Sequence, residues 1–286
     1  MTDGSTDAGW FRDLNHGDLH AARNAIENGS ADAPTDWPSR AVDAGFADDE
    51  ADYYDVLHDA TIHATREAVR ERERADDQQL KHSIRAMADC ERTANELAER
   101  AAEWGGSRYG EAGSGVGYAR RIASGEVGSG EESGDRVLRS LAERVVAVSE
   151  EADDLRAYIE RTAPAVAPNL SMLAGPVLAA RLISLAGGLE SLAKQPSGTV
   201  QVLGAEDALF AHLQGGAPSP KHGIIFTHEY VSGTRREERG SAARALAGKL
   251  SIAARIDHYS GDRRPALQRE LDERMERIRS RGGDGE

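Results

Sequence analysis

Apolar residues recur at a regular spacing between residues 138 and 159. Seven of them are separated by alternating steps of three and four residues, which is the heptad spacing of a coiled coil. A stripe this narrow covers only part of a helix surface, so it must pack against other helices. The pattern predicts a long helix that pairs within the chain and with a second copy. The seven residues are Leu138, Leu141, Val145, Val148, Ala152, Leu155 and Ile159.

A looser stripe of the same kind precedes it between residues 80 and 104. Two such helices predict an antiparallel hairpin, which we place at residues 66–165. Cys90 lies on the first stripe and is interpreted as a small core residue. This stripe consists of Leu80, Met87, Cys90, Ala94, Leu97, Ala101 and Trp104, with Ile84 beside it.

The segment between the two helices, residues 110–134, is rich in Gly, Ser and Glu. A glycine-rich phosphate-binding loop follows a strand and leads into a helix through a Gly-Lys-Ser/Thr sequence. No strand is predicted before these glycines, and no such sequence follows them. The segment therefore predicts a flexible tip of the hairpin, with one helical turn at residues 118–122.

Pro164 and Pro168 mark the end of the hairpin, because proline interrupts a helix. Beyond them, the spacing of apolar residues predicts an all-α domain over residues 166–286, with short extended or buried connections at 199–203 and 224–231. Its helices are expected at about 170–192, 204–213, 240–255 and 264–280.

Residues 1–65 form the remaining predicted domain. They hold 14 acidic and 3 basic residues, a net charge of −11, and Gly and Pro interrupt them repeatedly. Two short helices are expected, at 19–27 and 49–64. Trp10 and Phe11 are interpreted either as anchors for a partner or as part of a small local core.

The whole chain carries a net charge of −14, and only four of its 35 basic residues are Lys. Abundant Asp and Glu with little Lys resembles the proteins of halophiles that accumulate salt in the cytoplasm; an ordinary acidic protein is the alternative. The single cysteine excludes an intramolecular disulfide and a cysteine-based zinc site.

No secretory signal is expected, because the first residues lack a basic stretch followed by an apolar one. The most apolar window, residues 170–192, contains Pro176, Arg181 and Glu190. We interpret it as a buried helix pair and not as a membrane span. A soluble, cytoplasmic protein is expected.

No catalytic constellation stands out. The pairs His16 and His20, and His58 and His63, each offer two possible metal ligands without a third. No Ser lies in a Gly-x-Ser-x-Gly turn. The sequence gives no reason to expect an enzyme, a cofactor or a metal site.

Residues 166–286 are slightly basic inside an acidic chain, with 16 basic and 14 acidic residues. This part is a candidate surface for a polyanion, although charge balance on helix surfaces is the alternative. Gly204, Ala205 and Glu206 should open a helix, whose free backbone N–H groups suit a phosphate. A simple helix start, with Glu206 favouring the helix dipole, is the other interpretation.

Five further side chains suit an RNA. Lys221 and His222 end a proline-rich loop and offer a cation and a flat ring, although His222 is equally a structural loop residue. Arg244, Lys249 and Arg255 belong to the densest basic run, and Arg binds phosphate through its planar fork. An internal ion pair between Arg255 and Asp257 is the alternative for that residue.

Four motifs in the last 120 or so residues, in this order and spacing, resemble a Nop domain. Together with the hairpin before them, they resemble the archaeal Nop-domain scaffold of box C/D small ribonucleoproteins. The motifs occupy residues 167–171, 204–210, 220–226 and 251–257.

The resemblance implies a mainly α protein, with a long antiparallel coiled-coil hairpin, an all-α Nop domain and a shortened amino-terminal domain. It implies a non-catalytic scaffold that holds a box C/D guide RNA together with a kink-turn-binding ribosomal-protein homologue. Its coiled coil would join two copies, and its amino-terminal part would bind fibrillarin, the S-adenosylmethionine-dependent enzyme that methylates ribose 2′-hydroxyls. In the family, that part is an α/β unit about twice as long as residues 1–65.

The chain departs from the family at two positions. A Lys usually follows the Glu of the second motif, and an Arg often follows its Phe, whereas this chain has Asp207 and Ala211. Two cationic contacts are therefore in doubt. The alternatives are a Nop-domain protein that no longer binds fibrillarin and a coiled-coil structural protein without an RNA role.

Overall fold

The computed structural model describes residues 9–29, 33, 35–111, 113–128 and 132–280. All regular secondary structure within these residues is helical. The chain divides into two compact units, Met1–Ala75 and Asp76–Glu286, here called the amino-terminal and carboxy-terminal units. The predicted division into three domains stays a prediction, since the hairpin and the domain after it share one unit.

The amino-terminal unit contains α1 (Leu19–Asn28), α2 (Trp37–Asp43) and α3 (Glu50–Arg74). An aspartate caps the start of each helix by accepting a backbone N–H three residues ahead, which satisfies one of the helix's free donors. Part of the acidic composition thus serves local structure. Both predicted helices are present, and α3 continues ten residues beyond the expected end at 64.

Aromatic side chains form the core of this unit. Phe11 is 4% exposed and stacks on Phe46, with ring centroids 5.5 Å apart. The Trp10 indole N–H donates to the Tyr53 hydroxyl at 3.0 Å. Of the two interpretations of Trp10 and Phe11, the local core is confirmed.

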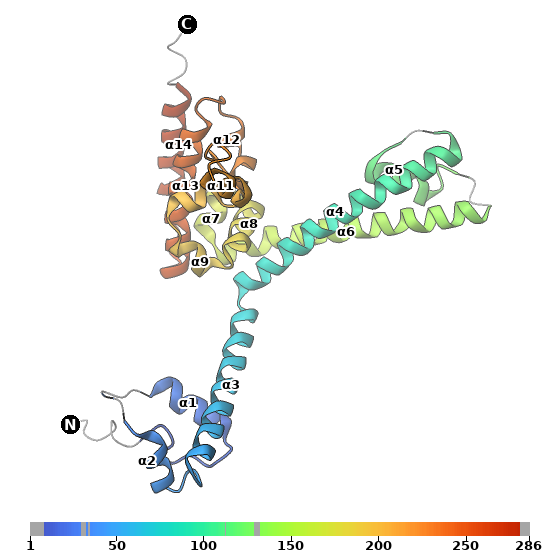
Figure 1. Ribbon diagram of the computed structural model, residues 1–286. Helices are drawn as coiled ribbons and strands as arrows, with labels where there is room; N and C mark the ends of the chain where they lie inside the picture. The colour runs from blue at the N-terminus through green and yellow to red at the C-terminus, as the bar shows by residue number, and fades with distance from the viewer. Residues whose placement is uncertain (1–8, 30–32, 34, 112, 129–131, 281–286) are drawn as a thin grey trace. The chain divides into compact units, whose positions relative to one another are not determined.

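The carboxy-terminal unit begins with a hairpin of α4 (Asp76–Tyr109) and α6 (Ser133–Val166), which lie side by side in Figure 1. The predicted heptad faces α4 at every second position: Leu138, Val145 and Ile159 are fully buried. The residues between them in the pattern, such as Val148, are only half-buried. Ala152 is buried like the first set, and Leu141 and Leu155 are half-buried like Val148.

The first stripe is confirmed along most of α4. Leu80, Met87, Ala94 and Ala101 are buried, as is Ile84 beside them. Cys90 and Leu97 are half-buried, and Trp104 is 38% exposed.

The tip of the hairpin contains α5 (Gly115–Ser124). Tyr118, Ala119 and Ile122 are buried between α4 and α6. A side chain at Gly105 would lie only 3.0 Å from the Tyr118 hydroxyl, so glycine is needed for this close approach. The prediction of a flexible tip with a single helical turn is wrong for residues 115–124, because a buried apolar face holds a full helix there. Residues 112 and 129–131 lie outside the described part.

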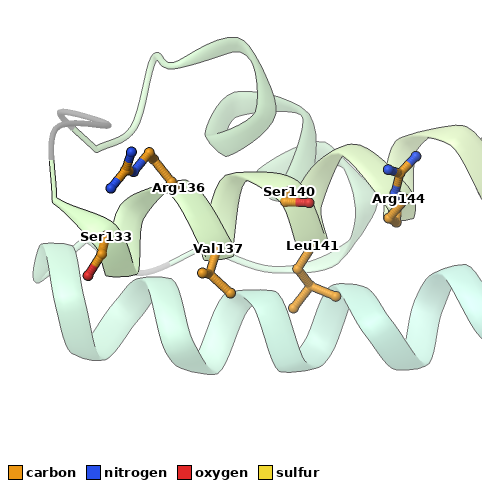
Figure 2. A pocket seen from close by; sticks show the side chains of 6 residues that line it. All are labelled: Ser133, Arg136, Val137, Ser140, Leu141 and Arg144. Atoms are coloured by element: carbon orange, nitrogen blue, oxygen red, sulfur yellow. The ribbon is translucent and has the colours of Figure 1, made fainter.

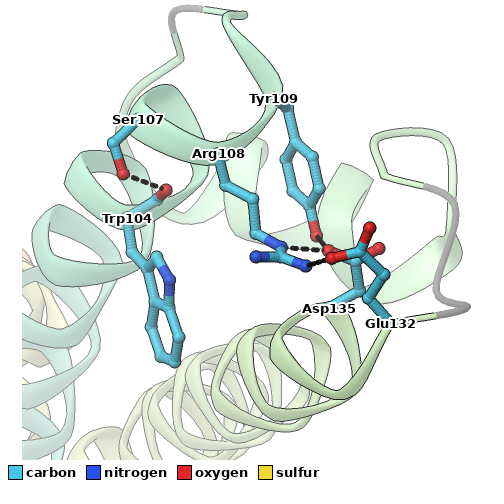
Figure 3. A network of polar contacts seen from close by, with 6 residues as sticks. All are labelled: Trp104, Ser107, Arg108, Tyr109, Glu132 and Asp135. Carbon is cyan, nitrogen blue, oxygen red and sulfur yellow. Dashed lines mark hydrogen bonds and ion pairs between the residues drawn. The ribbon is translucent and has the colours of Figure 1, made fainter.

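Polar contacts close the same end of the hairpin, as Figure 3 shows. The Arg108 guanidinium binds both Glu132 and Asp135, and the Tyr109 hydroxyl donates to Asp135 Oδ1 at 3.1 Å. Asp135 is buried, so these donors satisfy a carboxylate that has little access to water. They fix the end of α4 against the start of α6.

A shallow groove runs along one face of α6 near the tip (Figure 2). Val137, which is 57% exposed, and Leu141 point toward α4 in this view, between Arg136 and Arg144. The groove shows that α4 covers this face of α6 only in part. Ser133 and Ser140 complete its lining.

The remainder of the unit is a domain of short helices around one long helix. Two predictions differ in detail: the expected helix pair at 170–192 is three helices separated at Gly175 and Gly187, and the connections at 199–203 and 224–231 are short helices, buried at Val200 and Ile225 and not extended. The helices are α7 (Pro168–Ala174), α8 (Pro176–Ala186), α9 (Leu189–Lys194), α10 (Ser197–Val202), α11 (Glu206–Leu213), the 3₁₀ helix η1 (Ile224–Thr227), α12 (Glu229–Ser232), α13 (Arg239–Tyr259) and α14 (Ala266–Ser280).

Both corrections have a local cause. Gly175 and Gly187 adopt φ of 76° and 89°, a conformation that ends a helix and that glycine adopts without strain. Val200 and Ile225 are fully buried, and a short helical turn buries such residues as well as a strand does. β-Branched residues thus favoured the extended alternative, whereas the alternative of buried connections agrees with the structure.

Helix α13 lies at the centre of this domain, and its buried face consists largely of alanines. Small side chains let α7, α9, α10 and α14 approach it closely. Asp257, near its end, accepts hydrogen bonds from the backbone N–H groups of Asn169 (3.0 Å) and Leu170 (2.8 Å). The carboxylate thereby caps the start of α7.

The base of the hairpin is fastened to the same domain. The buried Asp77 accepts the Leu189 N–H at 2.8 Å, and the Gln78 amide donates to the Gly187 carbonyl at 3.2 Å. The Arg85 Nε donates to the Ser184 hydroxyl at 3.1 Å. These contacts attach the base of the hairpin to the end of α8 and the turn between α8 and α9.

No single helix in the described ranges is both long enough and apolar enough to cross a bilayer. Taken together, α7 and α8 have the length and composition of a membrane span, but they are bent by 116° relative to one another. Leu170, Leu173, Leu182 and Ile183 of this pair are buried in the core of the unit.

Candidate nucleic-acid interface

The loop that carries Lys221 and His222 is fixed against the end of α10. The Gln201 side-chain amide donates to the Lys221 carbonyl at 2.8 Å, and the Gly223 N–H donates to the Gln201 carbonyl at 2.9 Å. A Cβ at Gly223 would lie 2.0 Å from the Leu203 carbonyl oxygen, so only glycine fits there. The loop thus has one conformation, set by its backbone.

The second predicted motif lies beside this loop. The Ile224 N–H donates to the Leu203 carbonyl at 2.8 Å, and a Cβ at Gly204 would lie 3.2 Å from the Ile224 Cβ. Gly204 has φ +83°, and Ala205 follows as the residue before α11. The structure therefore brings residues 204–206 and 221–222 together.

The predicted phosphate contact at the start of α11 is already occupied. The Gly204 N–H donates to Glu206 Oε1 at 2.7 Å, and Asp207 adds a second carboxylate in the first turn. A phosphate would have to displace Glu206 and approach two negative charges. The geometry at this point fits the simple helix start.

Helix α11 offers a different kind of surface. None of its residues is buried, and Phe210 and Leu213 are 63% and 74% exposed. Exposed large apolar side chains beside charged ones are typical of a protein-contact surface. Leu185, which is 47% exposed and lies within 3.3 Å of a Cβ placed on Gly204, extends this apolar area.

Beside α11, an aromatic stack forms part of the surface. The rings of His222 and Phe226 lie 4.6 Å apart with planes inclined by 20°. The Arg239 guanidinium lies 5.3 Å from the Phe226 ring centroid and donates to the Thr234 carbonyl at 3.0 Å. We call His222, Phe226 and Arg239 the aromatic platform.

The platform combines stacking surfaces with positive charge. Burial, together with the charges of Arg239 and Lys221, lowers the pKa of His222 below its usual 6.5, so the ring is neutral at physiological pH. A neutral imidazole, a phenyl ring and a guanidinium plane all suit an unstacked base. Lys221 is exposed next to them and suits a phosphate.

Positive charge continues along α13. The Lys221 side chain passes Gly240, where a Cβ would lie 3.9 Å from its Cδ. Arg244 is one turn further along α13 and is exposed. Within the described part of the chain, Arg244 makes no ion pair, so its guanidinium is available to a phosphate. It lines a shallow groove with Ser241, Ala245, Gly248, Lys249, Ile252 and Arg274.

Lys249 shares this groove, but its ammonium group forms an ion pair with Glu270 of α14. The hydrogen bond from Lys249 is the main cause that lowers the pKa of the Glu270 carboxyl. The positive charge of Lys249 is thus partly neutralised within the protein. A phosphate that binds there competes with Glu270.

Arg255 has a structural role that neither sequence interpretation described. Its Nε and Nη2 donate to the carbonyls of Ala193 and Gln195, both at 3.1 Å, and so satisfy the end of α9. The alternative of an ion pair with Asp257 is wrong, because Asp257 binds the start of α7 instead. Arg255 and Asp257, two residues apart on α13, thus cap two other helices.

Phe226 was not among the predicted site residues. It lies in the run Ile224-Ile225-Phe226, which reads as core, and Ile225 is indeed fully buried while Phe226 is 37% exposed. Its place at the end of the motif at 220–226 and its four-residue spacing from His222 were the available signals. No described group of three or more His, Cys, Asp or Glu side chains could hold a metal ion.

Comparison with known proteins relates this geometry to one family. The family model "Nop", described as "snoRNA binding domain, fibrillarin", matches residues 127–279. An uncharacterized NOP5 family protein of Methanocaldococcus jannaschii is 49% identical over 143 residues, which are 50% of this chain and 34% of that protein. Nucleolar protein 56 of Schizosaccharomyces pombe is 40% identical over 161 residues, 54% of this chain and 32% of that protein.

The same match extends to animals. Nucleolar protein 56 of Homo sapiens is 44% identical over 123 residues, 43% of this chain and 21% of that protein. The chain therefore spans about a third or less of the length of these relatives. A chain in the crystal structure of a fibrillarin/Nop5p complex has the same fold, with a TM-score of 0.53 and 24% identity, over 95% of this chain and 99% of that chain.

The family match covers more than half of the residues, and it includes α6, the loop at Gly204, the aromatic platform and the basic face of α13. The helical fold predicted from the sequence, a long hairpin followed by an all-α domain, is confirmed by the structure and by this match. The chain belongs to the Nop family.

Proposed function

We propose that this chain is a non-catalytic, RNA-binding scaffold of a box C/D ribonucleoprotein, which directs guide-dependent 2′-O-methylation of ribose in target RNA. The observation that carries the proposal is that the aromatic platform, together with Lys221 and Arg244, begins at the loop that packs against Gly204 at the start of α11, the helix with the exposed Phe210 and Leu213. One surface suits RNA and its neighbour suits a protein, as a clamp on an RNA–protein complex requires.

The charges of the two surfaces suit different partners. Lys221 and Arg244 meet phosphates, and the platform stacks on an unpaired base of a kink-turn. Phe210 and Leu213 of α11 contact the protein already bound to that kink-turn, because Glu206 and Asp207 make this end of the site unfavourable for RNA alone. The guide supplies the sequence by base pairing, so this chain reads RNA shape.

The acidic composition sets a condition on this binding. In a cytoplasm of molar salt the Debye length is about 3 Å, and affinity based on counterion release falls steeply. Diffuse positive charge would contribute little, whereas stacking and directional contacts persist. A site built on a platform, few cations and an apolar protein contact suits a halophilic cytoplasm.

The hairpin and the amino-terminal unit complete the scaffold. The hairpin joins two copies through the half-buried side of the α6 heptad, and the amino-terminal unit holds fibrillarin, which supplies the methyltransferase chemistry. One observation favours a second candidate, a Nop-domain protein without fibrillarin: the regular secondary structure among the described residues of the amino-terminal unit is all helical, whereas the resemblance implies an α/β unit.

Reconstitution tests the proposal. The full chain is combined with a box C/D guide RNA, the kink-turn-binding protein, fibrillarin, S-adenosylmethionine and a target RNA in concentrated KCl. We expect a gel-shift complex that requires the kink-turn-binding protein, and ribose methylation that requires every component. A complex without methylation would favour the second candidate, and the absence of any RNA complex would reject the RNA role.

A further inference from the structure

The end of α8 contacts two parts of the carboxy-terminal unit. On one side, the Ser184 hydroxyl and the Gly187 carbonyl accept hydrogen bonds from side chains of α4, at 3.1 and 3.2 Å. On the other side, Leu185 Cδ1 lies 3.3 Å from a Cβ placed on Gly204. The end of α8 therefore joins the base of the hairpin to the loop from which the aromatic platform begins.

Three side chains of α4 make these contacts from the hairpin, and we call Asp77, Gln78 and Arg85 the attachment network. Asp77 Oδ2 accepts the Leu189 N–H at 2.8 Å. The Gln78 amide nitrogen lies 3.5 Å from the same oxygen, so two of the three side chains also contact each other. Arg85 donates from Nε to the Ser184 hydroxyl and from Nη2 to the Ser184 carbonyl, at 3.1 and 3.5 Å.

Stability alone does not explain a polar network at this place. Asp77, Gln78 and Ser184 are buried, and replacing buried charged groups by apolar side chains of similar size is often neutral or stabilising. Leu80 and Ile84 already pack into the apolar core that the hairpin shares with the domain after it, but apolar attraction has no preferred direction. Hydrogen bonds do have one. The attachment network therefore fixes the direction of the hairpin.

Direction matters because the hairpin is long. With 34 residues, α4 extends over about 51 Å, so a tilt of about 5° at its base moves its far end by about 4 Å. The first turn of α4 also follows directly on the amino-terminal unit, which ends at Ala75. A displacement of about 1 Å can slow a reaction by about 100-fold. A loosely attached hairpin would therefore misplace the groups that the scaffold holds.

We propose that Asp77, Gln78 and Arg85 are positioning residues for the methylation of target RNA. They fix the direction of the hairpin relative to the surface that binds RNA, and so restrict the methyltransferase to one nucleotide. The inference rests on the proposed function, because methylation is the reaction that this direction serves. The three side chains act through the hairpin, and the RNA surface keeps its own contacts without them.

Distances between two spin labels on the full chain measure the direction of the hairpin. The labels are attached to cysteines introduced at Glu143 on α6 and Arg269 on α14, which are both exposed, after Cys90→Ala removes the single native cysteine. Dilution with unlabelled chain restricts the signal to distances within one chain. With the attachment network intact we expect one narrow distance distribution.

Substitutions of similar size separate direction from stability. Asp77→Leu removes the acceptor of the Leu189 N–H, and Arg85→Met removes the donors to Ser184; each should broaden the distribution about twofold or more, because a tilt of a few degrees moves the hairpin by several ångströms. Asp77→Asn keeps an acceptor oxygen and should keep the distribution narrow.

The matched control lies inside the hairpin. Glu91→Met removes the ion pair between Glu91 of α4 and Arg156 of α6 (2.6 Å), which does not involve α8, and it should leave the distribution unchanged. Circular dichroism and urea unfolding confirm that each variant is folded.

Methylation assays connect this direction to the reaction. In the reconstituted complex we expect Asp77→Leu and Arg85→Met each to slow methylation of the target nucleotide by about tenfold or more. Asp77→Asn and Glu91→Met should stay within about twofold of wild type. Gel shifts with the kink-turn RNA and its protein should be the same for wild type and all four variants, whereas a general loss of folding would weaken them.

The outcomes separate the inference from the proposed function. If the wild-type complex forms on RNA without methylation, the proposed function fails and the positioning role fails with it, while the spin-label distances still decide whether the attachment network directs the hairpin. If Asp77→Leu and Arg85→Met keep the narrow distribution, the attachment network is rejected and the proposed function stands. A broad distribution with unchanged methylation would also overturn the inference, because the reaction would then not depend on the direction of the hairpin.

Discussion

His222 and Phe226 stack at a centroid distance of 4.6 Å, although one belongs to a loop and the other to η1. The stack exists because Gly223, between them, lets the backbone approach Leu203 and turn sharply. It leaves a neutral imidazole at the surface, next to an exposed Lys221. This pair is the most specific feature of the proposed RNA site.

Replacement of His222 by Ala should weaken assembly with the kink-turn RNA and its protein by about 5- to 150-fold, since stacking on one base contributes about 1–3 kcal/mol. Quantitative gel shifts at high salt measure it. His258→Ala, at the far end of α13, is the control and should have no effect. Equal losses for both variants would mean that the platform does not contact RNA.

Arg244 should contribute to RNA binding through charge. Arg244→Ala should weaken assembly and lower the slope of log affinity against log salt by about one. Lys249→Ala should do so less, because Glu270 already pairs with Lys249. Arg269→Ala and Arg277→Ala on α14 serve as controls, and equal effects at all four positions in a gel-shift series would contradict the assignment.

His228 should make the carboxy-terminal unit less stable below neutral pH. Its Nδ1 accepts the Tyr230 N–H at 3.1 Å and its Nε2 lies 3.0 Å from the Leu173 carbonyl, so only the neutral tautomer protonated at Nε2 satisfies both contacts. Burial lowers the pKa of His228 below 6.5. The stabilising contribution is therefore complete above the unfolded pKa and is lost as pH falls from about 6.5 through the folded value.

The change is measurable as a difference between two proteins. Urea unfolding of wild type should lose free energy between pH 7.5 and 5.5 relative to His228→Gln, which cannot titrate. An NMR titration of His228 with a midpoint at or above 6.5 would show that burial does not control this group.

The sequence indicated the helices better than their contacts. The heptad of α6 is a local pattern, so its helix was predictable; which of its positions the hairpin buries depends on how α4 lies against it, and that is set over the whole length of both helices. Residues 115–124 were underestimated because glycines around them obscured the apolar face of α5. Short helices at Val200 and Ile225 were missed because buried β-branched residues suit strands and helical turns alike.

The site residues show the same limit. Lys221, His222 and Arg244 were predictable as exposed groups of suitable chemistry, and the structure places them along one surface. Arg255 was not, because its acceptors are backbone carbonyls of Ala193 and Gln195, about sixty residues earlier, which carry no signal in side-chain chemistry. Gly204 was predicted to bind phosphate from its backbone N–H alone. In the structure the Glu206 carboxylate accepts that N–H, a contact that the expected role of Glu206 at the helix dipole did not include.

The heptad of α6 predicts two different effects of a charged substitution. Val145 is fully buried in the hairpin, so Val145→Glu should unfold α4 and α6, because an unpaired carboxylate inside an apolar core costs several kcal/mol. Val148 is half-buried. If its open side contacts a second copy, Val148→Glu should leave the helices intact and convert a dimer into a monomer.

Sedimentation equilibrium and circular dichroism distinguish the two effects. Wild type should sediment as a dimer, Val148→Glu as a folded monomer, and the exposed control Ala147→Glu as a dimer. High salt should strengthen the wild-type dimer, since apolar contacts gain from salt exclusion while the acidic chain is screened. A wild-type monomer at every salt concentration would reject the dimer, whereas a Val148→Glu dimer would place the contact elsewhere. The half-buried positions of the α6 heptad therefore report on contact with a second copy, because α4 covers only one side of α6.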